Sequence, residues 1–330
     1  MERIIEQNQI NKRLSELMED FEIIAPVKDG NLVLFKPIKK VEEVLSDYTN
    51  PLKPAKEFFF PPRESLFSFK DKGLEPSPRW ERNRIIWGIR PCDARSLSLL
   101  DKVFGGEYED SFYLEKRKKT LLVGLACRNP QSSCFCTSLN GGPHSTEGMD
   151  LLLTYLGEGT YFAQTVTSKG EELLNYAGVG VKKEDREKKE RLEDSAKKMI
   201  TKALEMPGDL EAIFDDPYWE RISRKCISCA ICSYLCPTCH CFDLTDEGRQ
   251  RIRFWDSCSF PLFTKMTSGE NPRREKRRRF RQRVYHKFDY FRKNFGQIAC
   301  VGCGRCVRQC PVKMDIVEVI NNIPRVEVKV

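Results

Sequence analysis

The chain of 330 residues is long enough for two domains, and its 40% hydrophobic content is sufficient for well-packed cores. A formal net charge of +8 is too weak by itself to indicate nucleic-acid binding. The longest apolar stretches fall far short of the roughly 20 residues that a membrane helix needs, and the N-terminus lacks the basic start and apolar run of a signal peptide. With aromatic residues at 10%, composition also argues against a disordered chain. We therefore expect a cytoplasmic protein without a membrane span.

The first half of the chain alternates between strand and helix patterns. Residues 1–25 predict a helix that runs into a short strand, and the turn at Asp29-Gly30-Asn31 predicts a hairpin. A loop with the sequence Phe-Phe-Phe-Pro-Pro follows at residues 58–62, which either packs within its own domain or is covered by a partner. Further strands are expected over 85–89, 121–127 and 161–166, and helices over 93–104 and from 171 to 176. This alternation indicates an α/β domain.

The composition changes after about residue 180. Residues 182–204 are dense in charge and predict a solvated helix, supported by ion pairs between residues four apart. From residue 218 onward the chain is rich in cysteine, aromatic residues and arginine. We therefore expect an α/β domain over residues 1–210, which ends in the charged connecting helix, and a second domain over residues 211–330.

Eight of the fifteen cysteines form one motif that occurs twice, Cys-x2-Cys-x2-Cys-x3-Cys-Pro. This is the bacterial-ferredoxin spacing for [4Fe–4S] clusters, in which the cysteine before proline binds the cluster of the other run. Zinc also takes four cysteines, but usually from separated pairs. We therefore predict a first cluster on Cys226, Cys229, Cys232 and Cys310, and a second cluster on Cys300, Cys303, Cys306 and Cys236. The expected fold of this domain is ferredoxin-like α+β, with an insertion of 63 residues between the runs.

Four other cysteines follow predicted buried strands. Cys92 comes after one strand, and Cys127, Cys134 and Cys136 come at and after the end of the next. Parallel neighbouring strands would bring these loops to one edge of the sheet, where open α/β sheets place their sites. The four thiolates could there hold a third [4Fe–4S] cluster; the alternative is that they pack as small hydrophobic side chains.

The last three cysteines, Cys239, Cys241 and Cys258, are expected to pack around the clusters, with additional metal ligation as the alternative. Three histidines are too few for a histidine-based metal centre, so we assign no metal role to His144, His240 or His286.

Residues 273–279 are the most cationic segment, and they precede a helical stripe of apolar residues at Phe280, Val284, Phe288 and Phe291. We interpret the cations as solvated, or as compensating the negative charge of the clusters. Docking of a partner is the alternative, and nucleic acid is the least favoured occupant. The sequence has no dinucleotide-binding or phosphate-loop motif and no persuasive catalytic arrangement, so we assign no catalytic residues.

Several motifs together resemble one family, the 4Fe-4S dicluster subunits typified by the beta subunit of cytosolic sulfhydrogenases and the A subunit of anaerobic sulfite reductases. The resemblance runs from about residue 20 to residue 320. The motifs that carry it are Pro61-Pro62-Arg63-Glu64-Ser65-Leu66-Phe67, Gly88-Ile89-Arg90-Pro91-Cys92-Asp93-Ala94, Cys134-Phe135-Cys136-Thr137-Ser138, Cys236-Pro237-Thr238-Cys239-His240-Cys241-Phe242 and Cys300-Val301-Gly302-Cys303-Gly304-Arg305-Cys306.

This resemblance implies a non-catalytic iron–sulfur subunit of an anaerobic oxidoreductase complex. Its partners would be a flavin subunit that handles NAD(P)H and a catalytic redox subunit of the hydrogenase, sulfite reductase or heterodisulfide reductase type. Two other classes stay open: a self-contained enzyme whose cysteines bind a catalytic metal, and an iron–sulfur redox sensor that acts on nucleic acid.

Overall fold

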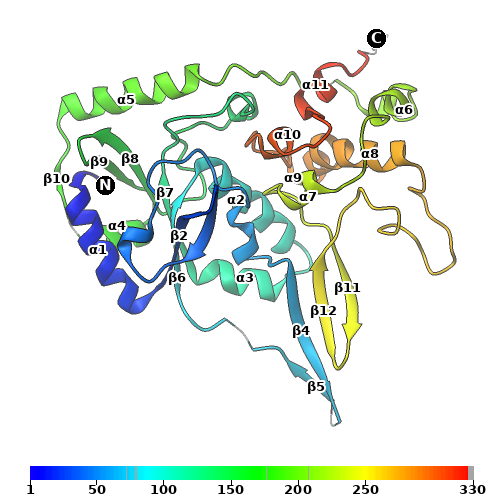
Figure 1. Ribbon diagram of the computed structural model, residues 1–330, viewed down its shortest axis with the longest axis horizontal. Coiled ribbons are helices and arrows are strands. Elements are labelled where there is room, and N and C mark those ends of the chain that lie inside the picture. The colour runs from blue at the N-terminus through cyan, green and yellow to red at the C-terminus, as the bar shows by residue number, and fades with distance from the viewer. Residues whose placement is uncertain (72, 79, 176, 207, 326–330) are drawn as a thin grey trace.

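A computed structural model describes residues 1–325 of the chain except 72, 79, 176 and 207 (Figure 1). Its larger sheet has eight strands in the order β10-β1-β9-β8-β7-β6-β2-β3. The four strands β2, β6, β7 and β8 run parallel, and the other pairs are antiparallel. The strands are β1 (Glu2–Glu6), β2 (Glu22–Asp29), β3 (Leu32–Pro37), β6 (Arg84–Ile89), β7 (Thr120–Leu125), β8 (Leu151–Gly157), β9 (Thr160–Thr165) and β10 (Val179–Gly180).

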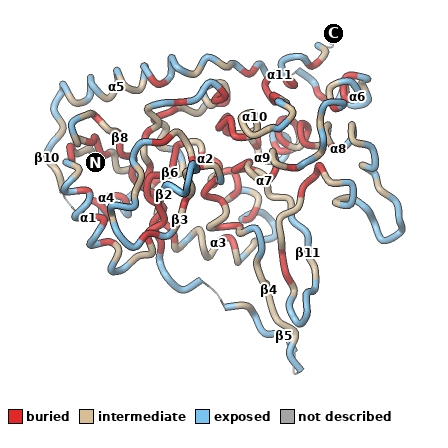
Figure 2. Tube along the Cα trace, in the orientation of Figure 1, coloured by how far each residue is buried: buried red, intermediate tan, exposed pale blue. Residues whose placement is uncertain are grey.

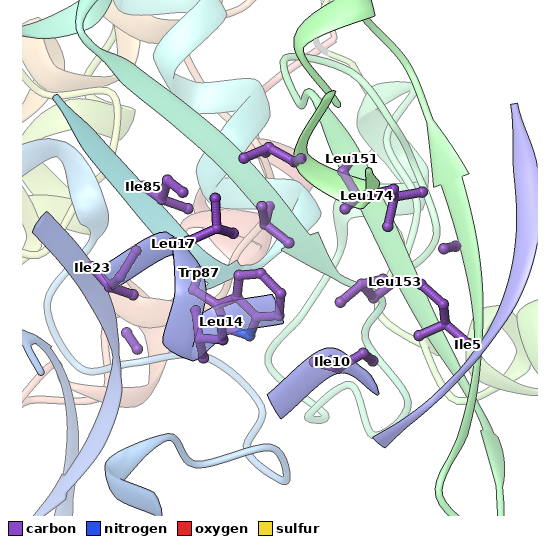
Figure 3. Close-up of a cluster of buried hydrophobic side chains, with 14 of the residues drawn as sticks. Ile5, Ile10, Leu14, Leu17, Ile23, Ile85, Trp87, Leu151, Leu153 and Leu174 are labelled. Atoms are coloured by element: carbon purple, nitrogen blue, oxygen red, sulfur yellow. The ribbon is translucent and has the colours of Figure 1, made fainter. Parts of the chain in front are cut away.

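Helices cover both faces of this sheet, because its central strands are apolar on both sides. Successive side chains of a strand point to opposite faces, so Ile85 and Trp87 of β6 enter one core while Ile86 enters the other. Figure 3 shows the first core, where α1 (Gln7–Asp20) and α4 (Ser168–Leu174) pack on the sheet. The second core lies under α2 (Pro91–Phe104) and α3 (Ser111–Lys118).

The N-terminus differs from its prediction. Residues 2–6 form strand β1, which pairs with β9 and β10, and the helix begins only at Gln7. The expected helix over the first six residues is therefore wrong, because pairing with strands about 160 residues away overrides the local pattern. The hairpin of β2 and β3 is confirmed, with Gly30 in the left-handed conformation that its turn requires (φ 58°). The helix expected from residue 171 begins at Ser168, and its expected end at Tyr176 lies outside the described residues.

The charged connecting helix is α5 (Lys183–Lys198), which leads from β10 toward α11 in Figure 1. Glu193 pairs with Lys189 at 4.0 Å and with Lys197 at 2.9 Å, both four residues away, as the sequence predicted. The remaining helices are α6 (Tyr218–Ser223), α7 (Ile231–Tyr234), α8 (Lys276–Tyr285), α9 (Phe291–Phe295), α10 (Arg305–Arg308) and α11 (Ile316–Asn321), with a π-helical turn (His286–Tyr290) between α8 and α9. No helix in the described part of the chain is long and apolar enough to cross a membrane.

A second sheet has four antiparallel strands in the order β11-β12-β4-β5 and forms an arm at the lower edge of Figure 1. Its strands are β4 (Arg63–Lys70), β5 (Gly73–Pro76), β11 (Phe242–Glu247) and β12 (Gln250–Trp255). This sheet therefore combines strands from both sides of the domain boundary proposed at residue 210. Apolar packing also crosses that boundary, since Leu99 of α2 shares a core with Phe291 and Val301.

The aromatic loop before β4 buries its two central residues, whereas Pro62 at its end is exposed. Strand β4 itself is only half-buried along most of its length (Figure 2). Phe59 and Phe60 are fully enclosed, and the ring of Phe60 lies 5.2 Å from that of Phe104 and 5.9 Å from that of Trp255. Of the two alternatives for this loop, coverage by a partner is wrong for Phe59 and Phe60, because the chain itself fills the space around them.

Candidate iron–sulfur sites

The two cysteine runs follow the same backbone path. The residues two and four positions after the first cysteine are left-handed in both: Ser228 and Ala230 (φ 56° and 61°), and Gly302 and Gly304 (φ 64° and 72°). A short helix then begins one residue later, α7 in the first run and α10 in the second. The repeated spacing in the sequence thus corresponds to a repeated local structure.

The first hollow is lined by the three leading cysteines of the first run together with Cys310 of the second run. Burial raises the pKa of Cys226, and negative charge on Cys232, Cys229 and Cys310 raises it further. Backbone amides also reach these thiols, since Ser228 N donates to Cys226 Sγ at 3.4 Å and Met314 N donates to Cys310 Sγ at 3.1 Å. The structure therefore brings together the four residues predicted for the first cluster.

Cys236, the last cysteine of the first run, does not line the first hollow. It lies with the three leading cysteines of the second run. Burial raises the pKa of Cys300 to about 11, with Lys287 opposing and Cys236 and Cys303 adding to this effect. Burial likewise raises the pKa of Cys306, whose thiol neighbours are Cys303, Cys236 and Cys300. The terminal cysteines of the two runs are thus exchanged in space, as the ferredoxin spacing predicts.

A third hollow is lined by Cys92, Cys127, Cys134 and Cys136. Cys92 stands in the first turn of α2, directly after β6, and Cys127 follows the parallel neighbour β7. Burial raises the pKa of Cys136 to about 12, and the neighbouring thiols of Cys134 and Cys127 contribute to the rise. The expected gathering of these residues at one sheet edge is therefore present in the structure.

The three groups of cysteines adjoin one another in the order first, second, third, and we call this order the row. Cys306, which belongs to the second group, also lines the first hollow. Cys303 of the same group lines the third hollow. The second group is therefore adjacent to both other groups, because one of its cysteines lines each of their hollows.

The segment that carries Cys134 and Cys136 packs directly on the backbone of the second run. Phe135 N donates to Gly302 O at 2.9 Å. Asn50, from an earlier loop, also contacts the second run, since its Nδ2 donates to Cys303 O at 3.1 Å. A Cβ atom on Gly302 would lie 2.5 Å from Cys136 Cα, and one on Gly304 would lie 2.5 Å from Ser133 Oγ. Both positions therefore need glycine for this close approach as well as for their positive φ.

A buried ion pair joins the same two groups. Arg305 binds Asp93 through two bonds of 2.6 Å and 2.7 Å, and both side chains are almost fully buried. The pair stands beside Cys92 and Cys303, and Arg305 Nε also donates to Pro51 O at 2.9 Å. Such bidentate geometry fixes the relative position of α2 and the second run.

The donor sets fit iron–sulfur clusters. Among the described residues, no three side chains of Cys, His, Asp or Glu converge closely enough to hold a single metal ion; the thiols instead surround hollows. Several buried cations approach these cysteines, among them Lys56, Arg283 and Lys287. None of these three forms an ion pair with a carboxylate in the part of the chain that the structure describes. Buried cations need nearby negative charge, which metal-bound thiolates would supply.

The cysteines outside the three groups lie close by. The thiols of Cys241 and Cys258 are hydrogen-bonded, and this bond lowers the pKa of Cys241. Cys239 accepts a bond from Arg283 Nη1 at 3.5 Å. That these three cysteines only pack around the clusters remains a prediction.

Burial lowers the pKa of each histidine. The pKa of His240 falls to about 3, and the pKa values of His144 and His286 fall to about 4. All three rings are therefore neutral near pH 7, and their lack of a metal role remains a prediction.

Sequence reasoning missed Lys56, Asp93, Arg283, Lys287 and Arg305 as parts of the site. Two signals could have found some of them. Asp93 and Arg305 lie inside the quoted cysteine motifs, and Arg283 and Lys287 each stand directly before a residue of the apolar stripe, Val284 and Phe288.

Comparisons with known proteins agree with this geometry. A family model described as a 4Fe-4S dicluster domain matches residues 225–314. Over 320 residues the chain is 30% identical to the sulfhydrogenase 2 subunit beta of Pyrococcus furiosus, and the match covers 94% of each chain. No solved structure matches the chain. The chain therefore belongs to the family of 4Fe-4S dicluster electron-transfer subunits that includes this sulfhydrogenase subunit.

Proposed function

We propose that this chain relays electrons inside a multi-subunit oxidoreductase, between a flavin subunit that binds NAD(P)H and a catalytic redox subunit. The catalytic subunit would be of the hydrogenase, sulfite reductase or heterodisulfide reductase type. The similar Pyrococcus furiosus protein is by name one subunit of a sulfhydrogenase, which supports a role within an assembly. The chain itself makes and breaks no substrate bond in this proposal.

The observation that carries the proposal is that the three cysteine groups are adjacent: Cys306 of the second group also lines the first hollow, and Cys303 of the second group also lines the third hollow. We assign the first [4Fe–4S] cluster to Cys226, Cys229, Cys232 and Cys310, the second to Cys300, Cys303, Cys306 and Cys236, and a third to Cys92, Cys127, Cys134 and Cys136. A bound cluster accepts and releases one electron, with its potential set by charge, hydrogen bonds to sulfur and exposure. The protein would hold the three clusters at fixed separations along one path.

The first site is the end of the row that meets solvent. Cys229 is exposed, and the neighbouring Ile227 is 60% exposed, whereas Val301 at the same position of the second run is 2% exposed. An apolar side chain beside a cluster suits a partner that approaches closely and excludes water. We therefore propose that a redox partner docks at Ile227.

Iron analysis is the first test of the proposal. Anaerobically purified chain should contain about twelve iron atoms with matching sulfide for three clusters, or about eight if the third is absent. Cys134→Ser should lower the iron content by about four atoms and leave the other clusters intact. Zinc in place of iron would contradict the iron–sulfur assignment, and unchanged iron in Cys134→Ser would contradict the third cluster alone.

The electron source is tested by adding NADH or NADPH with and without a flavin subunit. We expect reduction of the clusters only when the flavin subunit is present, because the sequence offers no dinucleotide-binding motif. Rapid reduction by the nucleotide alone would contradict the relay. Turnover by the isolated chain would instead favour the self-contained enzyme, and salt-dependent DNA binding would favour the sensor.

The docking site is tested by Ile227→Asp. Electron transfer from the partner should slow while the iron content stays at the parental value, because Ile227 is on the surface beside the first site. Leu244→Asp is the matched control, since Leu244 is 45% exposed but lies on the β11 arm. Equal slowing in both variants would place the partner elsewhere or indicate a general effect of charge.

A further inference from the structure

The buried ammonium group of Lys287 contacts a cysteine of the second site. The residue lies in the π-helical turn His286–Tyr290 and is 4% exposed. Its ammonium donates to Cys236 Sγ at 3.3 Å, to Thr238 Oγ1 at 3.0 Å and to Ala299 O at 3.0 Å. An ammonium has three N–H donors, so every donor is engaged and the charge is held in one place.

Arg283 lies four residues earlier, on the same face of the helix. It is buried, it lines the first hollow, and its Nη1 donates to Cys239 Sγ at 3.5 Å. The thiols that act most strongly on it are those of Cys232, Cys239, Cys306 and Cys236, which come from both cysteine runs. Its guanidinium therefore stands between the first and second sites.

The carboxylate of Asp289, two residues after Lys287, is engaged with another cation, since it pairs with Lys293 at 3.1 Å. Within the residues that the structure describes, no carboxylate forms an ion pair with Lys287 or Arg283. A buried, uncompensated cation is strongly unfavourable, so the anionic partner of these two side chains is the thiolate group itself.

The three sites differ in which groups donate hydrogen bonds to their cysteine sulfur atoms. In the first site, Cys226 and Cys310 accept hydrogen bonds from the backbone amides of Ser228 and Met314, which carry no net charge. In the third site, the buried Arg90 lies beside Cys127, but in the described part of the chain no cationic side chain donates a hydrogen bond to a sulfur atom of that group. Among the described residues, Cys236 is the only member of the three groups whose sulfur atom accepts a hydrogen bond from a cationic side chain.

We propose that Lys287 is a fixed counter-cation of the second site and that Arg283 is shared between the first and second sites, so that the second site holds an added electron more firmly than it would without these two cations. This inference rests on the proposed relay function. An added electron makes a cluster one charge more negative, and a fixed cation in a poorly solvated region stabilises the reduced form more than the oxidised form. Both cations act as positioning residues, since they contact sulfur ligands or their neighbours and leave the ligand set unchanged.

The test is a redox titration followed by EPR spectroscopy on the full chain, with the second cluster assigned as the signal that Cys236→Ser alters. At the potential where the parental second cluster is half reduced, Lys287→Met should lower its ratio of reduced to oxidised form about tenfold, a shift of about 59 mV for a one-electron couple. Lys287→Arg should restore the parental ratio, because it keeps the charge. Lys293→Met is the control, since Lys293 lies on the same helical segment and pairs with Glu211 and Asp289.

The outcomes separate this inference from the relay itself. A parental chain without iron would overturn the proposed function. A parental chain with iron, whose second cluster keeps its ratio in both Lys287→Met and Arg283→Met, would overturn only the counter-cation role. If Lys287→Met fails to bind iron, Arg283→Met decides: a lowered ratio supports the inference, and an unchanged ratio overturns it.

Discussion

The two cysteine runs share their spacing and backbone path, yet the protein surrounds them differently. In the first run, Ile227 is largely exposed and Ile231 opens the short helix α7. In the second run, the corresponding residues are the buried Val301 and Arg305, and Arg305 is tied to Asp93. The duplicated motif thus sets the local geometry of each site, whereas the rest of the chain makes one site enclosed and the other accessible.

Breaking the ion pair of the enclosed run should have the largest effect. Asp93→Asn leaves the guanidinium of Arg305 buried without its counter-charge, so we expect the free energy of unfolding to fall by about 3–5 kcal/mol. Denaturant titration under anaerobic conditions measures this loss. The double variant Asp93→Leu with Arg305→Met should recover much of it, because no unpaired charge remains; a loss below about 1 kcal/mol in Asp93→Asn would show that the pair does not anchor the second run.

The contact between the second run and the third group is the next most sensitive feature. Gly302→Ala places a Cβ atom 2.5 Å from Cys136 Cα at a left-handed position, so we expect a loss of about 2–4 kcal/mol together with loss of iron from the third site. Gly296→Ala is the matched control, because Gly296 has a similar φ of 70° with open space around its Cα. Equal losses in the two variants would mean that strain alone, and not the contact, requires glycine at residue 302.

Exchange of the terminal cysteines can be tested by a pair of variants. Cys310→Ser should disturb the cluster of the first run and Cys236→Ser that of the second, because each cysteine lies with the opposite run. Iron analysis should show at most about four atoms lost in each case, and EPR spectroscopy should show a different altered signal in the two variants. Damage confined to the cluster nearest in sequence would contradict the exchange.

The smallest effect is expected at Ser228, the counterpart of Gly302 in the accessible run. Ser228→Gly removes the cost of a left-handed serine but increases the freedom of the unfolded chain, so the free energy of unfolding should change by less than about 1 kcal/mol. Thermal or denaturant unfolding compares this variant directly with Gly302→Ala. A large change at Ser228 would mean that the first run is as tightly enclosed as the second.

The elements that sequence reasoning found are those with a strong local pattern. The continuous apolar run of β6 appears in the structure where it was predicted. Of the predicted apolar stripe, Val284, Phe288 and Phe291 are buried, and Phe280 is partly buried. Strand β1 was missed because Ile4 and Ile5 also fit a helix, and its strand partners lie about 160 residues away. The four-stranded sheet was missed because its paired strands β4 and β12 lie about 180 to 190 residues apart in sequence.

At the sites, spacing predicted which cysteines lie together but not what surrounds them. The cysteine spacing is short and specific, so the positions of the two terminal cysteines could be predicted from the sequence. Their ligation of the clusters remains a prediction. Lys287 and Arg283 follow a cationic segment, and a cation in sequence looks the same whether it is solvated or buried. Only the tertiary structure distinguishes the exposed Arg278 from the buried Arg283 of the same helix.

The pairing of β4 with β12 has a consequence for the synthesis of the chain. Strand β4 leaves the ribosome roughly 180 residues before its partner, which at 5–20 residues per second is an interval of about 10–35 s. During that time the edge of the β4–β5 hairpin that will bind β12 is unpaired, and an open strand edge is a template for association between nascent chains. The edge therefore stays open to such association until the insertion between the cysteine runs, which contains β12, has emerged.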